Sequence, residues 1–214
     1  MKTDAKSIIQ DGKAILGIEF GSTRIKAVLI DPENKPIAQG SHTWENQLVD
    51  GLWTYSIEEI WYGLQDCYAD LRANVKKLYD TEIEILAAIG VSAMMHGYMA
   101  FNEKEEILVP FRTWRNTNTG KAAAALSELF VYNIPLRWSI SHLYQAILDN
   151  EEHVNNIKYL TTLAGYVHWK ITGEKVLGIG DASGMLPIDP TTKNYSAEMI
   201  EKFDKLVAPK GFDW

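Results

Sequence analysis

The chain has a single cysteine, Cys67, among 214 residues. One cysteine excludes an intrachain disulfide and any zinc site that is built from several cysteines. Long hydrophobic runs are also lacking, because the longest nearly apolar stretch, residues 85–95, falls well short of the ~20 residues of a membrane-spanning helix. Residues 1–13 are polar and have no apolar segment typical of a secretory signal. We therefore expect a soluble, cytoplasmic protein.

Positive charge is scarce, with 21 Lys+Arg against 28 Asp+Glu and a net charge of −7. A general nucleic-acid-binding protein needs a basic face to neutralise phosphates, so this class is disfavoured. The remaining composition is that of a globular protein, with 46% hydrophobic and 23% charged residues. Because no repeat, low-complexity tract or linker interrupts the chain, we expect one α/β domain with a helical second half.

The first half predicts a mixed sheet. Apolar segments at residues 14–20, 25–30 and 35–44 are separated by short turns, and strands joined so closely must be antiparallel neighbours. Ser56 and Glu59 match a capping box, and apolar residues then recur at helical spacing to Leu78. Residues 85–93 predict a buried strand, which we expect to join the sheet in parallel because the chain reaches it through a helix.

The second half predicts mostly helices. Residues 100–109 indicate a hairpin, residues 181–189 an irregular or extended stretch, and Gly173 a helix end. The expected helices are residues 119–132, 142–150, 161–172 and 197–206. The histidines expected on helix or strand surfaces, without an assigned function, are His42, His142, His153 and His168. The tryptophans expected only to pack are Trp44, Trp53 and Trp61.

A first candidate site lies between the first two predicted strands. Glu19 ends a strand, Gly21 turns the chain, Ser22 and Thr23 add hydroxyls, and Lys26 lies on the returning strand. Backbone N–H groups in a tight glycine turn form an anion-binding concavity, and hydroxyls add donors for phosphate oxygens. A carboxylate beside such phosphates suits a hydrated Mg²⁺ ion. The alternative is an ordinary hairpin with a polar turn.

A second candidate site follows the strand predicted at residues 85–93. Ligands bind at the carboxyl ends of strands in open α/β sheets, and His96 lies at that position. An imidazole there can hydrogen-bond a hydroxyl-rich substrate, while Met95 packs against its carbon skeleton. The alternative is a buried histidine that is satisfied by a backbone carbonyl.

A third candidate is Trp114, which precedes Arg115 and Asn116. An exposed aromatic ring can stack on the C–H face of a sugar while polar neighbours bind its hydroxyls. The alternative is a core tryptophan whose polar neighbours cap the following helix.

Taken together, these segments resemble the N-terminal half of the FGGY carbohydrate kinases, the family of glycerol kinase, xylulokinase and ribulokinase. The resemblance extends from Ile15 to about Phe203, and its strand-end motif Met-His-Gly is similar to that of xylulokinases. The segments that carry it are residues 18–23, 51–53, 58–61, 91–97, 114–116, 171–173 and 180–184.

The resemblance implies an α/β fold of the ribonuclease H-like, actin/hexokinase type, with a mixed sheet that opens in an antiparallel meander and helices on both faces. It implies phosphoryl transfer from ATP with Mg²⁺ to a hydroxyl of a ketopentose or a related sugar or polyol. The implied phosphate-binding residues are Gly21, Ser22, Thr23 and Lys26. The implied sugar-binding residues are Met95, His96 and Trp114. Glu19 takes the position of the family's metal-binding aspartate.

Two departures from the family pattern bear on activity. Glu19 is one methylene longer than the aspartate it replaces. The family's catalytic base and adenine site belong to a C-terminal domain, and no segment of this chain resembles them; Asp181 lies in a different motif. We expect residues 1–13 to be an extension and residues 14–214 the N-terminal kinase domain, inactive alone. The alternative is a non-catalytic sugar- or phosphate-binding module with the same fold.

Overall fold

The computed structural model describes residues 5–212, which form two compact units. Unit 1 contains the residues up to Asn46 together with Tyr55–Met94. Unit 2 contains Gln47–Thr54 and the residues from Met95 onward. The helical second half that the sequence predicts is thus a compact unit of its own. Residues 1–4 of the expected extension and residues 213–214 of the expected kinase domain lie outside the described residues.

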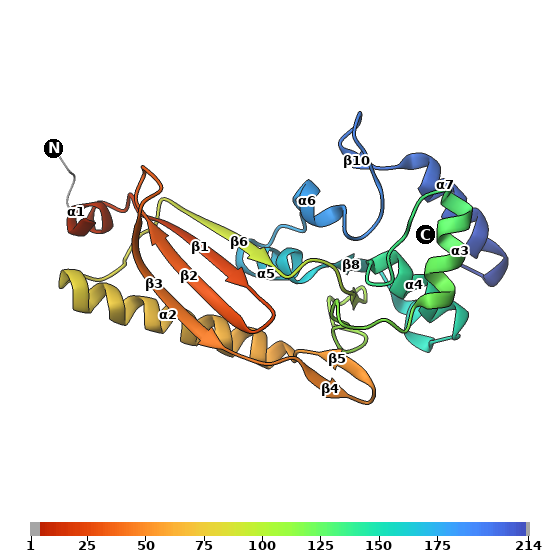
Figure 1. The fold of residues 1–214 in the computed structure, drawn as a ribbon, viewed down its shortest axis with the longest axis horizontal. Helices are drawn as coiled ribbons and strands as arrows, with labels where there is room; N and C mark the ends of the chain where they lie inside the picture. The colour runs from red at the N-terminus through yellow and green to blue at the C-terminus, as the bar shows by residue number, and fades with distance from the viewer. Residues whose placement is uncertain (1–4, 213–214) are drawn as a thin grey trace. The chain divides into compact units, whose positions relative to one another are not determined.

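Unit 1 is built on a four-stranded sheet with the strand order β3-β2-β1-β6 (Figure 1). β1 pairs antiparallel with β2, β2 pairs antiparallel with β3, and β6 pairs in parallel with β1. This arrangement confirms the predicted meander and the predicted parallel strand. The elements are α1 (Ala5–Gln10), β1 (Ile15–Phe20), β2 (Arg24–Ile30), β3 (Pro36–Thr43), α2 (Ile57–Tyr79) and β6 (Ala88–Ala93).

Helix α2 covers β2 and β3 and begins at the predicted cap. The Glu59 amide donates to Ser56 Oγ at 3.1 Å, and the Ser56 amide donates to Glu59 Oε2 at 3.0 Å. Gly40 of β3 allows the helix backbone to approach the sheet, because a Cβ at this position would clash with the backbone of Cys67 and Leu71. Burial between α2 and the sheet raises the pKa of the Cys67 thiol to about 11, so this cysteine is an inert packing residue.

One finding in unit 1 differs from expectation. The strand predicted as buried forms the exposed edge of the sheet, with Ile85 exposed by 68% and Ile89 by 49%. That prediction of burial was wrong because an apolar segment does not reveal what covers it. The expected extension contains helix α1, which buries Ile8 and Ile9.

Unit 2 combines helices with short two-stranded sheets. The predicted helices are confirmed in type and approximate extent, and Gly173 ends α5 in the left-handed conformation. Residues 100–109 form a tight turn, in which Asn102 N donates to Glu106 O at 3.0 Å, but β7 pairs mainly with β8. The first elements are β4 (Gln47–Val49), β5 (Leu52–Thr54), β7 (Met99–Phe101), α3 (Gly120–Phe130), α4 (Ser139–Leu148), η1 (Glu152–Asn156) and β8 (Tyr159–Thr161). The remaining elements are α5 (Leu163–Thr172), α6 (Ile179–Ala182), β9 (Ile188–Asp189), β10 (Asn194–Tyr195), α7 (Ala197–Val207) and η2 (Ala208–Lys210).

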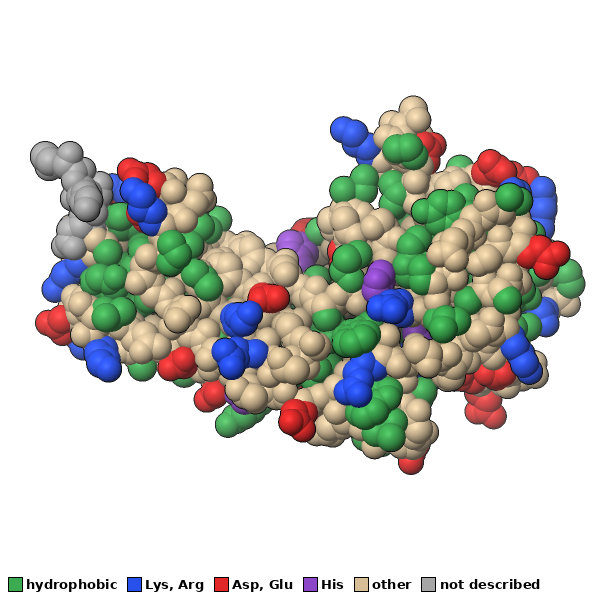
Figure 2. All heavy atoms as spheres, in the orientation of Figure 1, with side chains coloured by type: hydrophobic (Ala, Val, Ile, Leu, Met, Phe, Trp, Pro, Cys, Tyr) green, Lys and Arg blue, Asp and Glu red, His purple; other side chains and the backbone are tan. Residues whose placement is uncertain are grey.

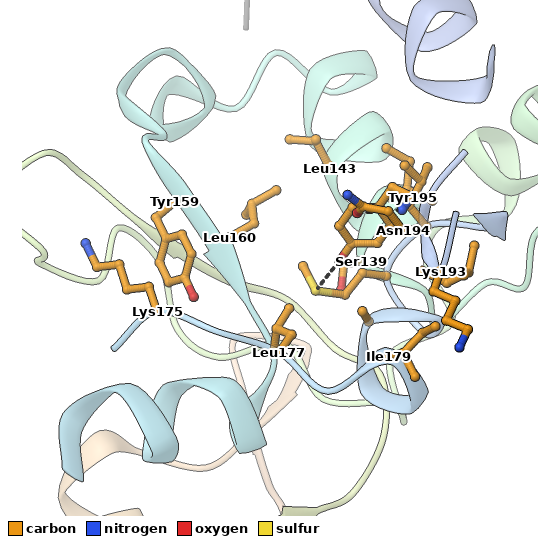
Figure 3. Close-up of a pocket in the computed structure, with 15 residues that line it drawn as sticks. Ser139, Leu143, Tyr159, Leu160, Lys175, Leu177, Ile179, Lys193, Asn194 and Tyr195 are labelled. Carbon is orange, nitrogen blue, oxygen red and sulfur yellow. Dashed lines mark hydrogen bonds between the residues drawn. The ribbon is translucent and has the colours of Figure 1, made fainter. Parts of the chain in front are cut away.

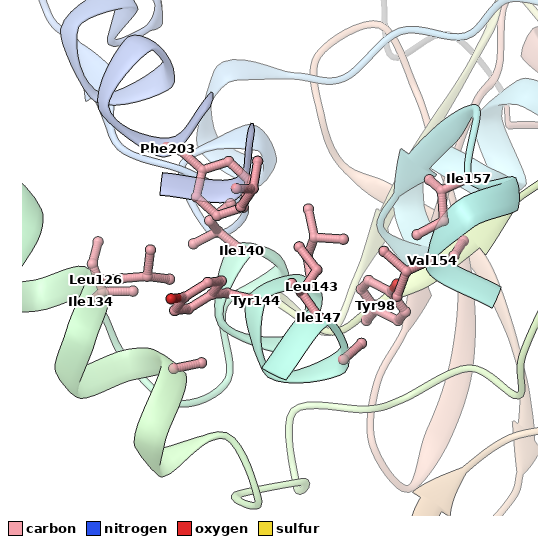
Figure 4. Packing of buried hydrophobic residues seen from close by; sticks show 14 of the residues in the cluster. Tyr98, Leu126, Ile134, Ile140, Leu143, Tyr144, Ile147, Val154, Ile157 and Phe203 are labelled. Carbon is pink, nitrogen blue, oxygen red and sulfur yellow. The ribbon is translucent and has the colours of Figure 1, made fainter. Parts of the chain in front are cut away.

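The core of unit 2 is built around α4. Figure 4 shows Ile140, Leu143, Tyr144 and Ile147 of this helix among apolar side chains of its neighbours, including Phe203 of α7. Such interdigitated burial is the main source of stability for short helices.

A buried polar network adjoins this core. The Arg112 guanidinium pairs with both carboxylate oxygens of Glu151, and Tyr98 Oη lies 2.8 Å from His153 Nε2. His142 is fully buried, and neither of its ring nitrogens has a hydrogen-bond partner in the described part of the chain. The surface positions predicted for His142 and His153 were therefore wrong, because contacts between distant segments bury both rings. Burial lowers the pKa of His142 to about 3.

No helix among the described residues is both long enough and apolar enough to cross a membrane.

Candidate functional site

The loop between β1 and β2, called here the glycine loop (Gly21, Ser22 and Thr23), is closed by a backbone bond. Gly21 N donates to Arg24 O at 3.0 Å. A Cβ at Gly21 would lie 2.9 Å from the same Arg24 oxygen, so the turn requires glycine.

Two aromatic residues hold the carbonyl groups of the glycine loop. Trp44 Nε1 donates to Gly21 O at 2.8 Å, Tyr55 Oη donates to Ser22 O at 2.5 Å, and Trp44 N donates to Thr23 O at 3.3 Å. The two rings stack at 4.1 Å between centroids.

The consequence for the loop is a set of free donors. Within residues 5–212 the amides and hydroxyls of Ser22 and Thr23 form no hydrogen bond. Donors left free while all three carbonyls are bound suit an anion. Sequence reasoning treated Trp44 as a packing residue and missed Tyr55, since nothing in the pattern shows that they meet the loop.

Glu19 and Lys26 face each other in the β1–β2 register, with 3.4 Å between Lys26 Nζ and Glu19 Oε2, and both side chains are about half exposed. They line an open groove of about 510 Å³ along the sheet. Gly17 and Gly90, opposite each other in the β1–β6 pair, line the same groove and leave the backbone uncovered there.

The residues around Glu19 set a limit on metal binding. No three His, Cys, Asp or Glu side chains come together as a metal site in the part of the chain that the structure describes. A single carboxylate fits Mg²⁺ that keeps most of its waters and is shared with nucleotide phosphates. Glu19 fits that role, and it does not form a closed protein site.

In unit 2 the histidine loop (Met95, His96 and Gly97) has an unusual backbone. His96 has φ 71° and Gly97 has φ 107°, both in the left-handed region. Gly97 N donates to Arg137 O at 3.2 Å, and Ser139 Oγ donates to Gly97 O at 2.6 Å. A non-glycine residue in this region costs conformational energy, which persists only where surrounding contacts fix the backbone.

The His96 imidazole is half-buried, and its Nδ1 lies against the Gly184 backbone without a well-formed hydrogen bond. Burial lowers the pKa of His96, and the nearby Arg137 charge lowers it further, while the Gly184 backbone and Asp181 oppose this shift. The ring is therefore neutral at pH 7, with one nitrogen that donates and one that accepts.

Trp114 is half-buried rather than exposed, and the Arg137 guanidinium lies 5.9 Å from its ring centroid. Its polar neighbours serve another element. Arg115 covers the ring of Trp53 at 3.6 Å, and the buried Asn116 side chain binds the Trp53 amide and carbonyl at 2.9 and 2.8 Å. The Trp-Arg-Asn motif thus fixes the β4–β5 hairpin, while Arg137 connects Trp114 to the histidine loop.

Three residues near His96 were not assigned to the site from the sequence, namely Arg137, Asp181 and Gly184. Burial raises the pKa of Asp181, whose carboxylate accepts a hydrogen bond from Thr162 Oγ1. The motif at residues 180–184 is the signal that could have directed attention to Asp181 and Gly184.

The predicted residues are thus divided between the two units. Glu19, Lys26 and the glycine loop belong to unit 1, whereas the histidine loop and Trp114 belong to unit 2.

A separate pocket of about 490 Å³ in unit 2 is mainly apolar (Figure 3). Leu143, Leu160, Leu177 and Ile179 line it, and none of the predicted sugar-binding residues does. Its polar groups are partly engaged, since Lys175 Nζ pairs with Glu105 at 2.9 Å.

A meander, a crossover helix and a parallel strand define an α/β fold of the actin/hexokinase type. Residues 14–206 match the N-terminal domain of the FGGY family of carbohydrate kinases. The chain belongs to this family.

Relatives of known function support the same assignment. The chain is 19% identical over 196 residues to xylulose kinase of Escherichia coli (strain K12), covering 88% of this chain and 40% of that protein. It is 21% identical over 207 residues to xylulose kinase of Lactococcus lactis subsp. lactis (strain IL1403), covering 92% and 40%. The solved xylulose kinase of Rhodospirillum rubrum shares the fold, with a TM-score of 0.75, 17% identity, and coverage of 88% and 41%. The chain thus spans about 40% of the length of these curated relatives.

Proposed function

We propose that this chain is the N-terminal domain of an ATP-dependent sugar kinase that phosphorylates a hydroxyl of a ketopentose or a related sugar or polyol. Residues 14–214 form that domain, residues 1–13 are an extension, and a C-terminal domain supplies the catalytic base and the adenine site. The names of the xylulose kinase relatives support a ketopentose. We place the enzyme in the cytoplasm, where its ATP is available.

The histidine loop is the observation that carries this proposal. A neutral imidazole on a backbone fixed by Arg137 and Ser139 can bind one sugar hydroxyl through Nε2, because Nδ1 is buried against Gly184. Met95, exposed by 43%, and the half-buried ring of Trp114 offer apolar surface for the carbon skeleton of a sugar.

The glycine loop supports the phosphate half of the reaction. Free amides and hydroxyls of Ser22 and Thr23 would bind phosphate oxygens, Lys26 would neutralise charge, and Glu19 would hold Mg²⁺ together with those phosphates. The ion neutralises phosphate charge when it is bound. Phosphoryl transfer depends mainly on positioning and charge stabilisation, so these residues can act without covalent chemistry of their own.

The exposed edge of the sheet favours a larger enzyme over a stand-alone binding module. β6 presents Ile89 to solvent, Ile85 just before it is also exposed, and natural proteins cover or charge such edges. Further chain of the same enzyme would cover it. Basic and acidic side chains are interspersed on the face seen in Figure 2, so that face offers no broad basic surface for nucleic acid.

The test is sugar-dependent ADP release with xylulose, ribulose, gluconate and glycerol. A protein that continues this chain to the length of its relatives should turn over a ketopentose fastest, and Glu19→Gln should slow it because the charge that attracts Mg²⁺ is lost. The 214-residue chain alone should show no turnover above a no-sugar control. Turnover by the chain alone would reveal a catalytic base within it and contradict the proposal.

A further inference from the structure

The imidazole of His96 lies directly against Gly184, in the turn that follows α6. A Cβ built on Gly184 would lie 2.6 Å from His96 Nδ1 and 3.2 Å from its Cε1. Side-chain carbons do not approach a ring nitrogen that closely. This orientation of the His96 ring and any side chain at position 184 are therefore mutually exclusive.

Both partners of this contact are attached to the start of α4. Gly184 N donates to Asp181 O at 3.0 Å, and the next residue, Met185, accepts from Ile140 N at 3.1 Å. On the other side, Ser139 Oγ donates to Gly97 O at 2.6 Å. The segment around Gly184 and the backbone of the histidine loop are thus both hydrogen-bonded to the start of α4. A site with a fixed side-chain geometry requires such common support.

We propose that Gly184 is a positioning residue whose missing side chain sets the orientation of the His96 imidazole. The role of that imidazole in binding a sugar hydroxyl rests on the proposed function. A hydrogen bond weakens steeply when its angle departs from linearity, so a displaced ring would bind the hydroxyl poorly.

The contact with His96, rather than a backbone conformation that only glycine adopts, explains why residue 184 is a glycine. The φ angle of Gly184 lies outside the left-handed region, so alanine would not strain the backbone there. The atoms that a new Cβ would meet belong to the end of a side chain that can rotate. Gly184→Ala should therefore fold and displace only the ring.

Gly180, within α6, provides a matched control. A Cβ at Gly180 would meet nothing within 4 Å, so Gly180→Ala makes the same change four residues away without the contact.

The direct test is an NMR titration of the histidine ring protons in the 214-residue chain, with His96 assigned by the signal that His96→Ala removes. The charged groups that act on the ring are Arg137 and Asp181, and both are unchanged in the variants. In Gly184→Ala the His96 signals should shift and its pKa should change, because the ring leaves both its buried position and the Gly184 backbone. Gly180→Ala should titrate like the wild type. A His96 titration that is unaltered in Gly184→Ala would overturn the proposal.

The second arm measures the affinity for xylulose by calorimetry. Gly184→Ala should weaken binding about tenfold, the size expected for one lost hydrogen bond. In a His96→Ala background the same substitution should cost nothing further, since its effect passes through the ring. An additional loss in the double variant would contradict a role through His96. Absence of sugar binding by the wild-type chain would contradict the proposed function instead, and the titration would still decide the role of Gly184.

Discussion

The glycine loop of unit 1 and the histidine loop of unit 2 differ in what they leave available to a ligand. In the glycine loop, the side chains of Trp44 and Tyr55 bind backbone carbonyls, which leaves backbone amides and hydroxyls free. In the histidine loop, Ser139 Oγ and the Arg137 carbonyl fix the backbone at Gly97, and the His96 ring lies against Gly184.

The difference matches the two kinds of ligand that a sugar kinase must bind. A phosphate presents several equivalent acceptor oxygens, so a concavity of free donors suffices for it. Two epimeric sugars differ in the direction of one hydroxyl, and an imidazole in a fixed orientation forms a good hydrogen bond with only one of these directions. Each prediction below perturbs one side of this comparison.

The largest effect is expected in the polar network beneath the histidine loop. Tyr98, which follows Gly97, donates its amide to Arg112 O at 2.9 Å, and Arg112 is buried against Glu151. Glu151→Ala leaves the buried guanidinium without its partner and should lower the free energy of unfolding by ~3 kcal/mol.

Urea unfolding followed by circular dichroism measures this loss. Lys202→Ala, which removes the exposed pair with Glu198, serves as the control and should leave the midpoint unchanged. A loss below ~1 kcal/mol for Glu151→Ala would show that the network does not support unit 2.

Acid should destabilise the chain through His142. Its pKa is about 3 in the folded protein and ordinary in the unfolded chain, so the unfolded chain binds the proton first as the pH falls. The contribution of the neutral His142 ring to the free energy of unfolding is fully present above ~pH 6.5. As the pH falls from there to the pKa of the folded protein, the free energy of unfolding decreases by about 1.4 kcal/mol per pH unit. Burial also lowers the pKa values of His96 and His153, which add to the loss in the same direction.

His142→Leu should reduce the decrease of the unfolding free energy per pH unit. It should not destabilise the protein at pH 7, because the ring nitrogens it removes have no hydrogen-bond partners among the described residues. His168→Gln, which changes a histidine outside the network, is the control. The measurement is the unfolding free energy from pH 7.5 to 4.5. Equal slopes for His142→Leu and the wild type would exclude His142 as the source.

The predictability of the fold also differs between the two units. The meander and the Ser56–Glu59 capping box depend on neighbours in sequence, and the parallel strand is predicted from the helix that leads to it. In unit 2, His153 meets Tyr98 across 55 positions and Arg112 meets Glu151 across 39, so local patterns could not reveal that these residues are buried.

The candidate site divides in the same way. The places of Gly21, Ser22 and Thr23 in a turn and of His96 after a strand could be predicted from short motifs, because turns and strand ends have local signatures. The residues that hold them, Tyr55 and Gly184, act through contacts that only the folded chain creates.

The smallest effect concerns the anchor of the glycine loop. Tyr55→Phe removes the hydroxyl that binds Ser22 O but keeps the stacking on Trp44, so stability should fall by ~1 kcal/mol. Hydrogen exchange of the Gly21 amide, which closes the loop on Arg24 O, should become faster, while amides of β6 keep their rates. Unaltered exchange in the loop would mean that Trp44 alone anchors it.

The most direct test of the account compares the two loops in one binding experiment. Calorimetry with xylulose is carried out on the 214-residue chain, on His96→Ala and on Tyr55→Phe. The account assigns sugar binding to the histidine loop. It therefore predicts that His96→Ala weakens xylulose binding about tenfold, whereas Tyr55→Phe leaves the affinity unchanged. Equal affinity for His96→Ala and the wild type, or an equal loss in both variants, would contradict it.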